Sequence, residues 1–254
     1  MTGELSREGP EHALWEQNAG WWQAQCTDGA DPEYAELIVP LAAELLAGYD
    51  RVLDIGAGEG QLSRLAAGLG ASLVVGVDPT RAQVVEAARR SGGPVYARGQ
   101  AEALPIADRS FDAAVACLVF EHIDAMDTAV TEAARMLRDG GRFLLFLNHP
   151  LLQTPDSSWI DDHILDPPEQ YWRIGAYLRE SVMIEEVQKG VFLPFVHRPL
   201  SRYVNALRDA GLAIDRMLEP SPPPGFLAAA PEYPQAQTIP RLLVLVCRKE
   251  PQSA

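Results

Sequence analysis

Cysteine is scarce in this sequence, and no long apolar run is present. Three cysteines, Cys26, Cys117 and Cys247, are widely spaced and odd in number. This pattern argues against a disulfide framework and a zinc site, and it is typical of a reducing compartment, so we expect a cytoplasmic protein. No segment approaches the roughly 20 apolar residues of a membrane helix. The polar start, residues 1–12, lacks the apolar core of a signal peptide. We therefore expect no membrane insertion.

Basic residues are also few. There are 21 Lys and Arg against 35 Asp and Glu, which gives a net charge of −14. A protein that binds nucleic acid needs basic surface to displace counterions from phosphates. The longest basic cluster is Arg89-Arg90. The composition thus disfavours a nucleic-acid partner, and an anionic membrane surface for the same reason.

The most informative segment is residues 52–63, which read VLDIGAGEGQLS. An apolar run ends at Asp54, three alternating glycines follow (Gly56, Gly58, Gly60), and an amphipathic segment comes next. A strand, a glycine turn and a helix in this order form a nucleotide-sized pocket at the carboxyl end of the strand. The spacing G-x-G-x-G differs from the G-x-G-x-x-G of dinucleotide folds. The pattern therefore favours an adenosine cofactor other than NAD.

Two acids support this interpretation. The next apolar run, residues 73–77, ends at Asp78, where a carboxylate can accept hydrogen bonds from both ribose hydroxyls of an adenosine. That position fits NAD and S-adenosylmethionine equally. Asp54 separates them, because a carboxylate beside the glycine turn would repel a pyrophosphate. It suits a ligand that carries an ammonium and a sulfonium group.

These motifs resemble those of the class I S-adenosylmethionine-dependent methyltransferases. Later segments at 99–105 (GQAEALP), 110–112 (SFD) and 137–142 (LRDGGR) match the remaining motifs in the same order. The resemblance is closest to the bacterial small-molecule group that includes the ubiquinone/menaquinone-type methyltransferases, and it covers about residues 34–148. It implies S-adenosyl-L-methionine as the cofactor. In many relatives an Asp stands where this chain has Gln100, whose carbonyl can still accept a hydrogen bond from the adenine amino group.

The chain alternates strands and helices up to Pro150, which predicts an α/β fold with a parallel sheet and helices on both faces. The predicted strands are 51–55, 73–77, 94–98, 112–118 and 142–147. The predicted helices are 12–25, 34–47, 60–69, 80–91 and 125–137. After Pro150 the alternation stops, and a helix at 201–211 is followed by strands at 212–218 and 241–248. The resemblance implies a Rossmann-like, seven-stranded and mostly parallel sheet that these last two strands close as an antiparallel pair.

This pattern divides the chain into four parts. We expect an N-terminal tail and lid helix in 1–33 and the S-adenosylmethionine-binding core in 34–149. A cap insertion over the acceptor site would occupy 150–196, and 197–254 would complete the core sheet.

Ligands of open α/β sheets bind beyond the carboxyl ends of the strands. This rule, with the resemblance placing Gln83 against the adenosine, selects the residues that would bind the cofactor. They are Asp54, Gly56, Ala57, Gly58, Gly60, Asp78, Pro79, Gln83, Gln100, Ala101, Glu102 and Leu118.

Methyl transfer from a sulfonium requires alignment of the nucleophile and, for some acceptors, a base. A histidine can serve, since its pKa lies near neutrality. His149 is the first candidate because it follows the fifth strand, although His149-Pro150 could simply turn the chain. His122 and His197 are further candidates, each with a structural alternative. The cluster 161–163 (DDH) lacks further ligand spacing, so we expect no metal.

Four residues are candidates for binding the acceptor. Trp22 lies on the predicted lid helix, and Tyr171 and Trp172 could form an aromatic wall around an apolar acceptor. Arg198 could bind an acidic group. Each also has a simpler explanation, since aromatic residues build ordinary cores and Arg198 could cap the insertion.

The sequence therefore predicts an S-adenosylmethionine-dependent methyltransferase that acts on a small molecule, with O-methylation favoured because hydroxyls are common acceptors. Two alternatives stay open: a methyltransferase of tRNA or protein, and a non-catalytic S-adenosylmethionine-binding module. A homodimer is left open as well.

Overall fold

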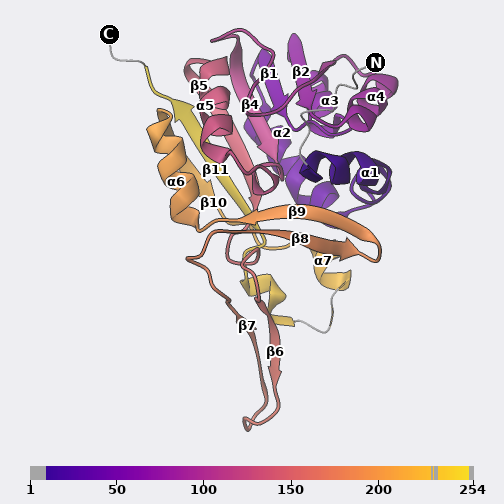
Figure 1. Ribbon diagram of the computed structural model, residues 1–254, viewed down its shortest axis with the longest axis vertical. Helices are drawn as coiled ribbons and strands as arrows, with labels where there is room; N and C mark the ends of the chain where they lie inside the picture. Colours follow the sequence, from indigo (N-terminus) through magenta and orange to yellow (C-terminus); the bar gives the residue numbers. More distant parts are fainter. Residues whose placement is uncertain (1–9, 230, 232–233, 252–254) are drawn as a thin grey trace, which may run out of the picture.

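The computed structural model describes residues 10–229, 231 and 234–251 (Figure 1). Its centre is a seven-stranded sheet in the order β10-β11-β5-β4-β1-β2-β3. Strands β5, β4, β1, β2 and β3 pair in parallel. Strand β11 is antiparallel to both β5 and β10. The sheet strands are β1 Arg51–Ile55, β2 Leu73–Asp78, β3 Val95–Arg98, β4 Phe111–Cys117, β5 Leu137–Asn148, β10 Leu212–Leu218 and β11 Leu242–Lys249. This confirms the predicted Rossmann-like fold.

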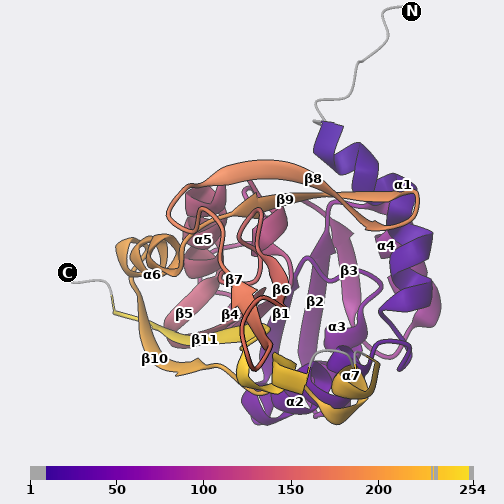
Figure 2. The same cartoon turned by 90° about the horizontal axis from the view of Figure 1, so that it is seen from below.

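Helices cover both faces of the sheet (Figure 2). Alternate residues of each strand point to opposite faces, so Leu53 and Ile55 pack toward α5 and α6, while Val52 packs toward α2 and α3. The helices are α1 Pro10–Gln25, α2 Val39–Leu46, α3 Gln61–Gly68, α4 Arg81–Arg90, α5 Met126–Met136, α6 Leu200–Asp209 and α7 Pro224–Ala229, with short helical turns η1 Tyr34–Ile38, η2 Phe120–His122 and η3 Pro234–Thr238. None of the described helices combines the length and apolar character needed to cross a membrane.

The fifth strand begins earlier than the sequence indicates. We predicted a helix that ends at 137 and a strand from 142, but β5 starts at Leu137 and contains Gly140 with φ +77°. Phe111 of β4 pairs with Leu137, and Ala113 pairs with Arg142, so residues 138–141 bulge out of the ladder. The start of β5 is therefore set by its pairing with β4 and not by the local Gly140-Gly141 pair.

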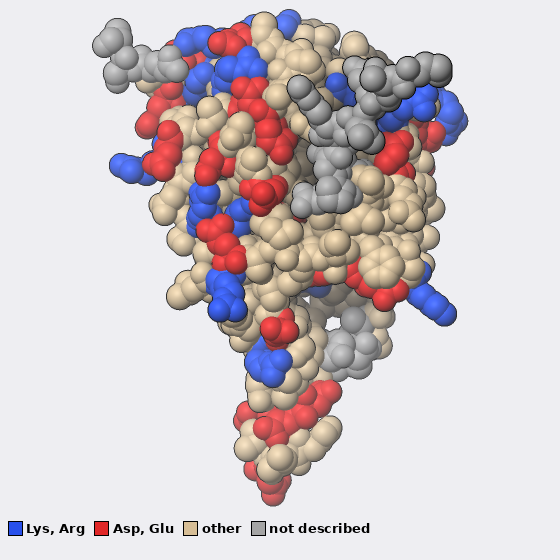
Figure 3. Space-filling model, in the orientation of Figure 1, with Lys and Arg blue, Asp and Glu red and all other residues tan. Residues whose placement is uncertain are grey.

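The segment after β5 forms two antiparallel hairpins instead of further βαβ units. One pairs β6 Ser158–Asp162 with β7 Glu169–Arg173, and the other pairs β8 Ser181–Gln188 with β9 Val191–His197. Both lie beyond the carboxyl edge of the parallel strands, and β9 runs against α1 (Figures 1 and 2). The β6–β7 hairpin projects away from the sheet and carries acidic residues toward its tip (Figure 3).

The N-terminal part of the predicted tail, residues 1–9, lies outside the described residues. The helix expected at 12–25 is α1, and its role as a lid stays a prediction.

Gly60 begins α3 and is fixed by packing. Its φ is +87°, in the left-handed region that favours glycine, and a Cβ there would overlap the ring and hydroxyl of Tyr96 on β3. Gly48 has nearly the same φ, +86°, but a Cβ there would meet no atom within 4 Å. An alanine at Gly48 would meet only the backbone strain, whereas an alanine at Gly60 would meet the same strain and a steric overlap as well.

We expect Gly48→Ala to lower the free energy of unfolding by about 1–2 kcal/mol, the cost of left-handed backbone for a residue with a Cβ. Gly60→Ala should cost about 1–3 kcal/mol more, because the Tyr96 ring must move. Urea unfolding of both variants measures this difference. An equal loss in the two would show that Tyr96 does not constrain the loop.

Candidate active site

A cavity opens at the carboxyl ends of β1, β2 and β4, beside α1. Every residue expected to bind the cofactor lines it except Gly60, which instead packs on Tyr96. The lining residues from that set are Asp54, Gly56, Ala57, Gly58, Asp78, Pro79, Gln83, Gln100, Ala101, Glu102 and Leu118. They come together because the carboxyl ends of parallel strands meet at one edge of the sheet.

Hydrogen bonds hold the glycine loop against the end of β2. The backbone N–H groups of Gly56 and Ala57 donate to the carbonyl of Val77, at 2.8 and 3.1 Å. The N–H of Gly58 donates to Asp78 Oδ2 at 2.9 Å, and Thr80 N–H donates to Asp78 Oδ1 at 2.8 Å. The Asp78 carboxylate thus connects the loop after β1 to the start of α4.

The floor of the cavity holds two buried carboxyl groups. Asp54 is 2% exposed and Asp78 is 7% exposed. Burial raises the pKa of Asp54 to about 7, although Ser63 Oγ–H donates to its Oδ2 at 2.6 Å. Burial also raises the pKa of Asp78, against the hydrogen bonds from Thr80 and Gly58. A cationic ligand with hydroxyl donors would offset this desolvation.

Aromatic side chains from α1 form the opposite wall. Trp15 and Trp22 both line the cavity, with ring centroids 5.7 Å apart, and Trp22 lies edge-on to Tyr34 at 6.1 Å. Trp22, a candidate for acceptor contact, therefore lies in the cavity that contains the predicted cofactor residues.

Of the three candidate histidines, His122 lines this cavity. Its ring packs against Trp15 and Phe195, at centroid distances of 4.8 and 4.5 Å. Nδ1 lies 2.6 Å from the carbonyl oxygen of Pro194, which can only accept, so Nδ1 carries the proton and Nε2 keeps its lone pair. Burial lowers the pKa of His122 to about 4, so the ring is neutral at neutral pH.

His149 and His197 do not line the cavity. Nε2 of His149 is 2.8 Å from Glu219 Oε1, and its Nδ1 accepts the N–H of Leu151. Nε2 of His197 bonds the carbonyl of Tyr177 at 2.8 Å. These contacts favour the alternatives considered for both residues, in which they turn the chain and fasten the insertion.

The other acceptor candidates are dispersed. Arg198 is 3% exposed, and its guanidinium donates to the carbonyls of Phe120, Ile123 and Asp124, so it fixes the segment that carries His122. Tyr171 is exposed on the β6–β7 hairpin. Trp172 lines a second cavity at the end of β5.

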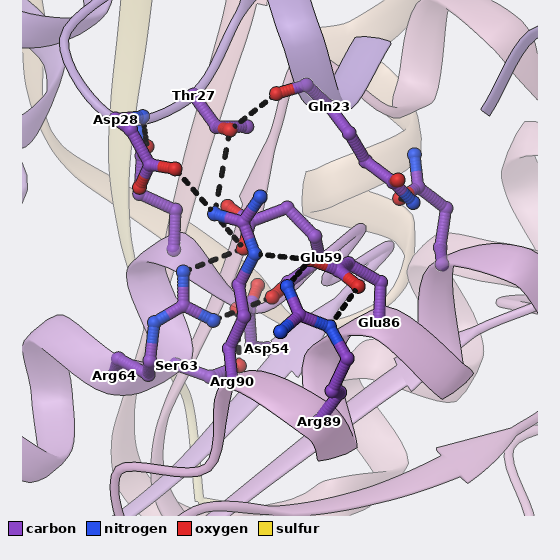
Figure 4. Close-up of polar contacts among 12 residues, drawn as sticks. Gln23, Thr27, Asp28, Asp54, Glu59, Ser63, Arg64, Glu86, Arg89 and Arg90 are labelled. Carbon is purple, nitrogen blue, oxygen red and sulfur yellow. Dashed lines mark hydrogen bonds and ion pairs between the residues drawn. The ribbon is translucent and has the colours of Figure 1, made fainter. Parts of the chain in front are cut away.

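An ionic cluster that the sequence did not predict lies beside the glycine loop (Figure 4). Glu59, 1% exposed, pairs through Oε2 with Arg64 at 2.5 Å and with Arg90 at 3.0 Å. Arg90 also binds Asp28 Oδ2 at 2.9 Å and lies 3.5 Å from Thr27 Oγ1. Glu59 and Thr27 both line the cavity, so Arg90 on α4 fastens the segment after α1 to the glycine loop. No local pattern reveals this, because the partners are far apart in the chain.

The fold and this edge of the sheet define the class of protein. Residues 53–145 match the family model described as a methyltransferase domain. The chain is similar to the ubiquinone biosynthesis O-methyltransferase of Rhizobium etli (strain CIAT 652), 43% identical over 178 residues, which are 63% of this chain and 68% of that one. The chain belongs to the S-adenosylmethionine-dependent methyltransferases.

Two further curated relatives carry the same description. The enzyme of Agrobacterium fabrum is 45% identical over 168 residues, covering 63% of this chain and 65% of that one. For the enzyme of Rhizobium rhizogenes the match covers 40% of this chain and 42% of that one, at 42% identity. The chain thus spans less than two thirds of the length of both relatives.

Among solved structures, an S-adenosylmethionine-dependent methyltransferase from Mesorhizobium loti superposes with a TM-score of 0.70 and 26% identity, over 83% of this chain and 96% of that one. The family confirms the expected cofactor, S-adenosyl-L-methionine.

The ionic cluster gives a paired test. Arg90→Ala should lower the free energy of unfolding by about 1–3 kcal/mol, since it leaves buried Glu59 with one cation. It should also weaken S-adenosylhomocysteine binding, because the segment after α1 is no longer fastened to the loop. Neighbouring Arg89 is exposed and, among the described residues, its one ion-pair partner is Glu86. Arg89→Ala is therefore the matched control. Calorimetry that finds the same affinity for both variants would contradict this role.

Proposed function

We propose that the protein transfers the methyl group of S-adenosyl-L-methionine to a hydroxyl of a small-molecule acceptor. The observation that carries this is the cavity in which the glycine loop, Asp54 and Asp78 meet at the sheet edge. The description of the relatives as O-methyltransferases supports a hydroxyl acceptor.

The residues that line the cavity suit the cofactor. A carboxylate offers about four acceptor sites, so Asp78 can bond Gly58 and Thr80 and still accept two ribose hydroxyls. Asp54 would balance the positive charge of the ligand, and Gln100 and Ala101 would lie against the adenine. When bound, S-adenosylmethionine supplies the methyl group and a good leaving group.

His122 is the residue we assign to the acceptor. Its Nδ1–H is held by the Pro194 carbonyl, so the Nε2 lone pair is fixed in direction. Nε2 would accept a hydrogen bond from the acceptor hydroxyl, orient its oxygen for in-line attack, and take up the proton as the methyl group moves. Trp15 and Phe195 both pack against the ring and would help to exclude water.

Charge supports a small acceptor over a macromolecular one. The face seen in Figure 3 intersperses basic with acidic side chains, and the hairpin beyond the sheet edge is acidic. On this face, the described residues form no basic stripe of the kind that RNA binding needs.

The three cysteines are free, which supports the expected cytoplasmic location.

Turnover separates this proposal from a non-catalytic binding module. The purified protein, given labelled S-adenosylmethionine and a panel of phenols and other small alcohols, should release S-adenosylhomocysteine. Asp78→Asn should bind S-adenosylhomocysteine roughly 10–100-fold more weakly, because charge-assisted hydrogen bonds to the ribose are lost. If no acceptor yields product although calorimetry shows tight cofactor binding, the module interpretation replaces the enzyme.

His122→Phe tests the acceptor assignment while keeping an aromatic ring against Trp15 and Phe195. We expect kcat to fall about 100-fold, the lower range for loss of a positioned base, with the affinity for S-adenosylhomocysteine nearly unchanged. Steady-state kinetics and calorimetry measure the two quantities. His149→Phe, at a histidine that does not line the cavity, is the control. If it lowers kcat as much as His122→Phe, the assignment to His122 fails.

A further inference from the structure

A second cavity lies at the carboxyl end of β5, between the β6–β7 hairpin and the segment that leads into β11. Its walls include Asn148, Trp159, Trp172, Phe226 and Arg241. It shares no lining residue with the cofactor cavity. All of its lining residues lie outside the region 53–145 that matches the methyltransferase domain. The cavity is therefore built by parts of the chain outside the matched methyltransferase domain.

Two buried nitrogen donors of this wall have no acceptor. They are Nε of Arg241 and Nε1 of Trp172. Buried N–H groups are almost always hydrogen-bonded, since leaving one unpaired costs its full desolvation. Both donors belong to residues that line this cavity, so a ligand that brings acceptor oxygens could satisfy them.

The charge of the wall is positive. None of the described residues that line the cavity is acidic, and Arg241 supplies the guanidinium. Among the described residues its carboxylate partner is Glu33, whose Oε2 lies 3.4 Å from Nη2, whereas the well-formed pair of Arg202 and Asp127 has distances of 2.5 and 2.7 Å. The charge of Arg241 is thus only loosely compensated, and an anion can take it up.

The shape of the wall is aromatic. The rings of Trp159 and Trp172 are 5.6 Å apart at 80°, and the Arg241 guanidinium lies 4.0 Å from the centroid of the Phe226 ring. Perpendicular and stacked aromatic faces of this kind select a flat ring by edge and face contacts.

We propose that this cavity binds an aromatic carboxylate, with the carboxylate accepting from Arg241 Nε–H and Trp172 Nε1–H and the ring packed among Trp159, Trp172 and Phe226. The assignment rests on the proposed function, within which the cavity holds the acidic end of the methyl acceptor. Asn148 connects the two sites, because its side chain and backbone N–H both donate to Glu121 Oε1, at 3.0 and 3.1 Å, and Glu121 precedes His122.

The test uses 2-naphthoate as the probe and its neutral isostere 2-naphthamide, followed by ligand-observed NMR without cofactor. The full chain should bind the acid at least about 10-fold more tightly than the amide, as expected for charge-assisted hydrogen bonds. Arg241→Gln should reduce this affinity by a similar factor. Trp172→Phe keeps the ring, removes the Nε1 donor and should weaken binding several-fold. Arg248→Gln, on β11, the strand that Arg241 directly precedes, removes a cation paired with Asp215 and is the control that should change nothing.

Binding of S-adenosylhomocysteine to each variant shows whether the fold and the cofactor cavity are intact. Equal affinity for the acid and the amide, or no loss in both Arg241→Gln and Trp172→Phe, would overturn the proposal, as would failure of the probe to bind the unaltered protein. These outcomes differ from failure of the proposed function, which is an absence of methyl transfer and does not depend on naphthoate binding.

Discussion

The carboxylate of Asp78 holds the edge of the sheet on which the candidate site is built. One oxygen accepts from the loop after β1, through Gly58, and the other accepts from Thr80 at the start of α4. Because the group is almost fully buried, these bonds replace its lost hydration, and removing either would leave a desolvated charge short of donors. The cavity lies between the two loops that Asp78 joins, so its shape depends on this one side chain.

Around that edge, different parts of the chain supply different functions. The cofactor wall comes from the parallel strands and the loops that follow them. The opposite wall comes from α1 and from the segment of the η2 turn, which buried Arg198 fixes through three backbone carbonyls. Relatives can therefore share the methyl donor while differing in the acceptor, because the matched region contains the first wall and little of the rest.

The sequence predicted the sheet strands and most helices closely, since each depends on apolar periodicity and glycine turns within a few consecutive residues. It placed the start of β5 wrongly, because the bulge at 138–141 depends on pairing with β4. It expected Gly60 to contact the ligand, but that residue faces Tyr96 from another strand. Among the histidines it ranked His149 first. In the structure His122 lines the cavity, and Glu219 engages His149.

The sequence by itself determined the fold class and the methyl donor, because the acid, the glycine turn and the acid after the next strand are local patterns that a parallel sheet brings to one edge. Tertiary structure alone decided which histidine meets the cavity, how Arg90 fastens Asp28 to Glu59, and that Arg241 and Trp172 face one aromatic cavity. Those features join residues far apart in the chain. These contacts are stabilised by burial and by charges that come together only when the chain is folded. No residue spacing in the sequence therefore predicts them.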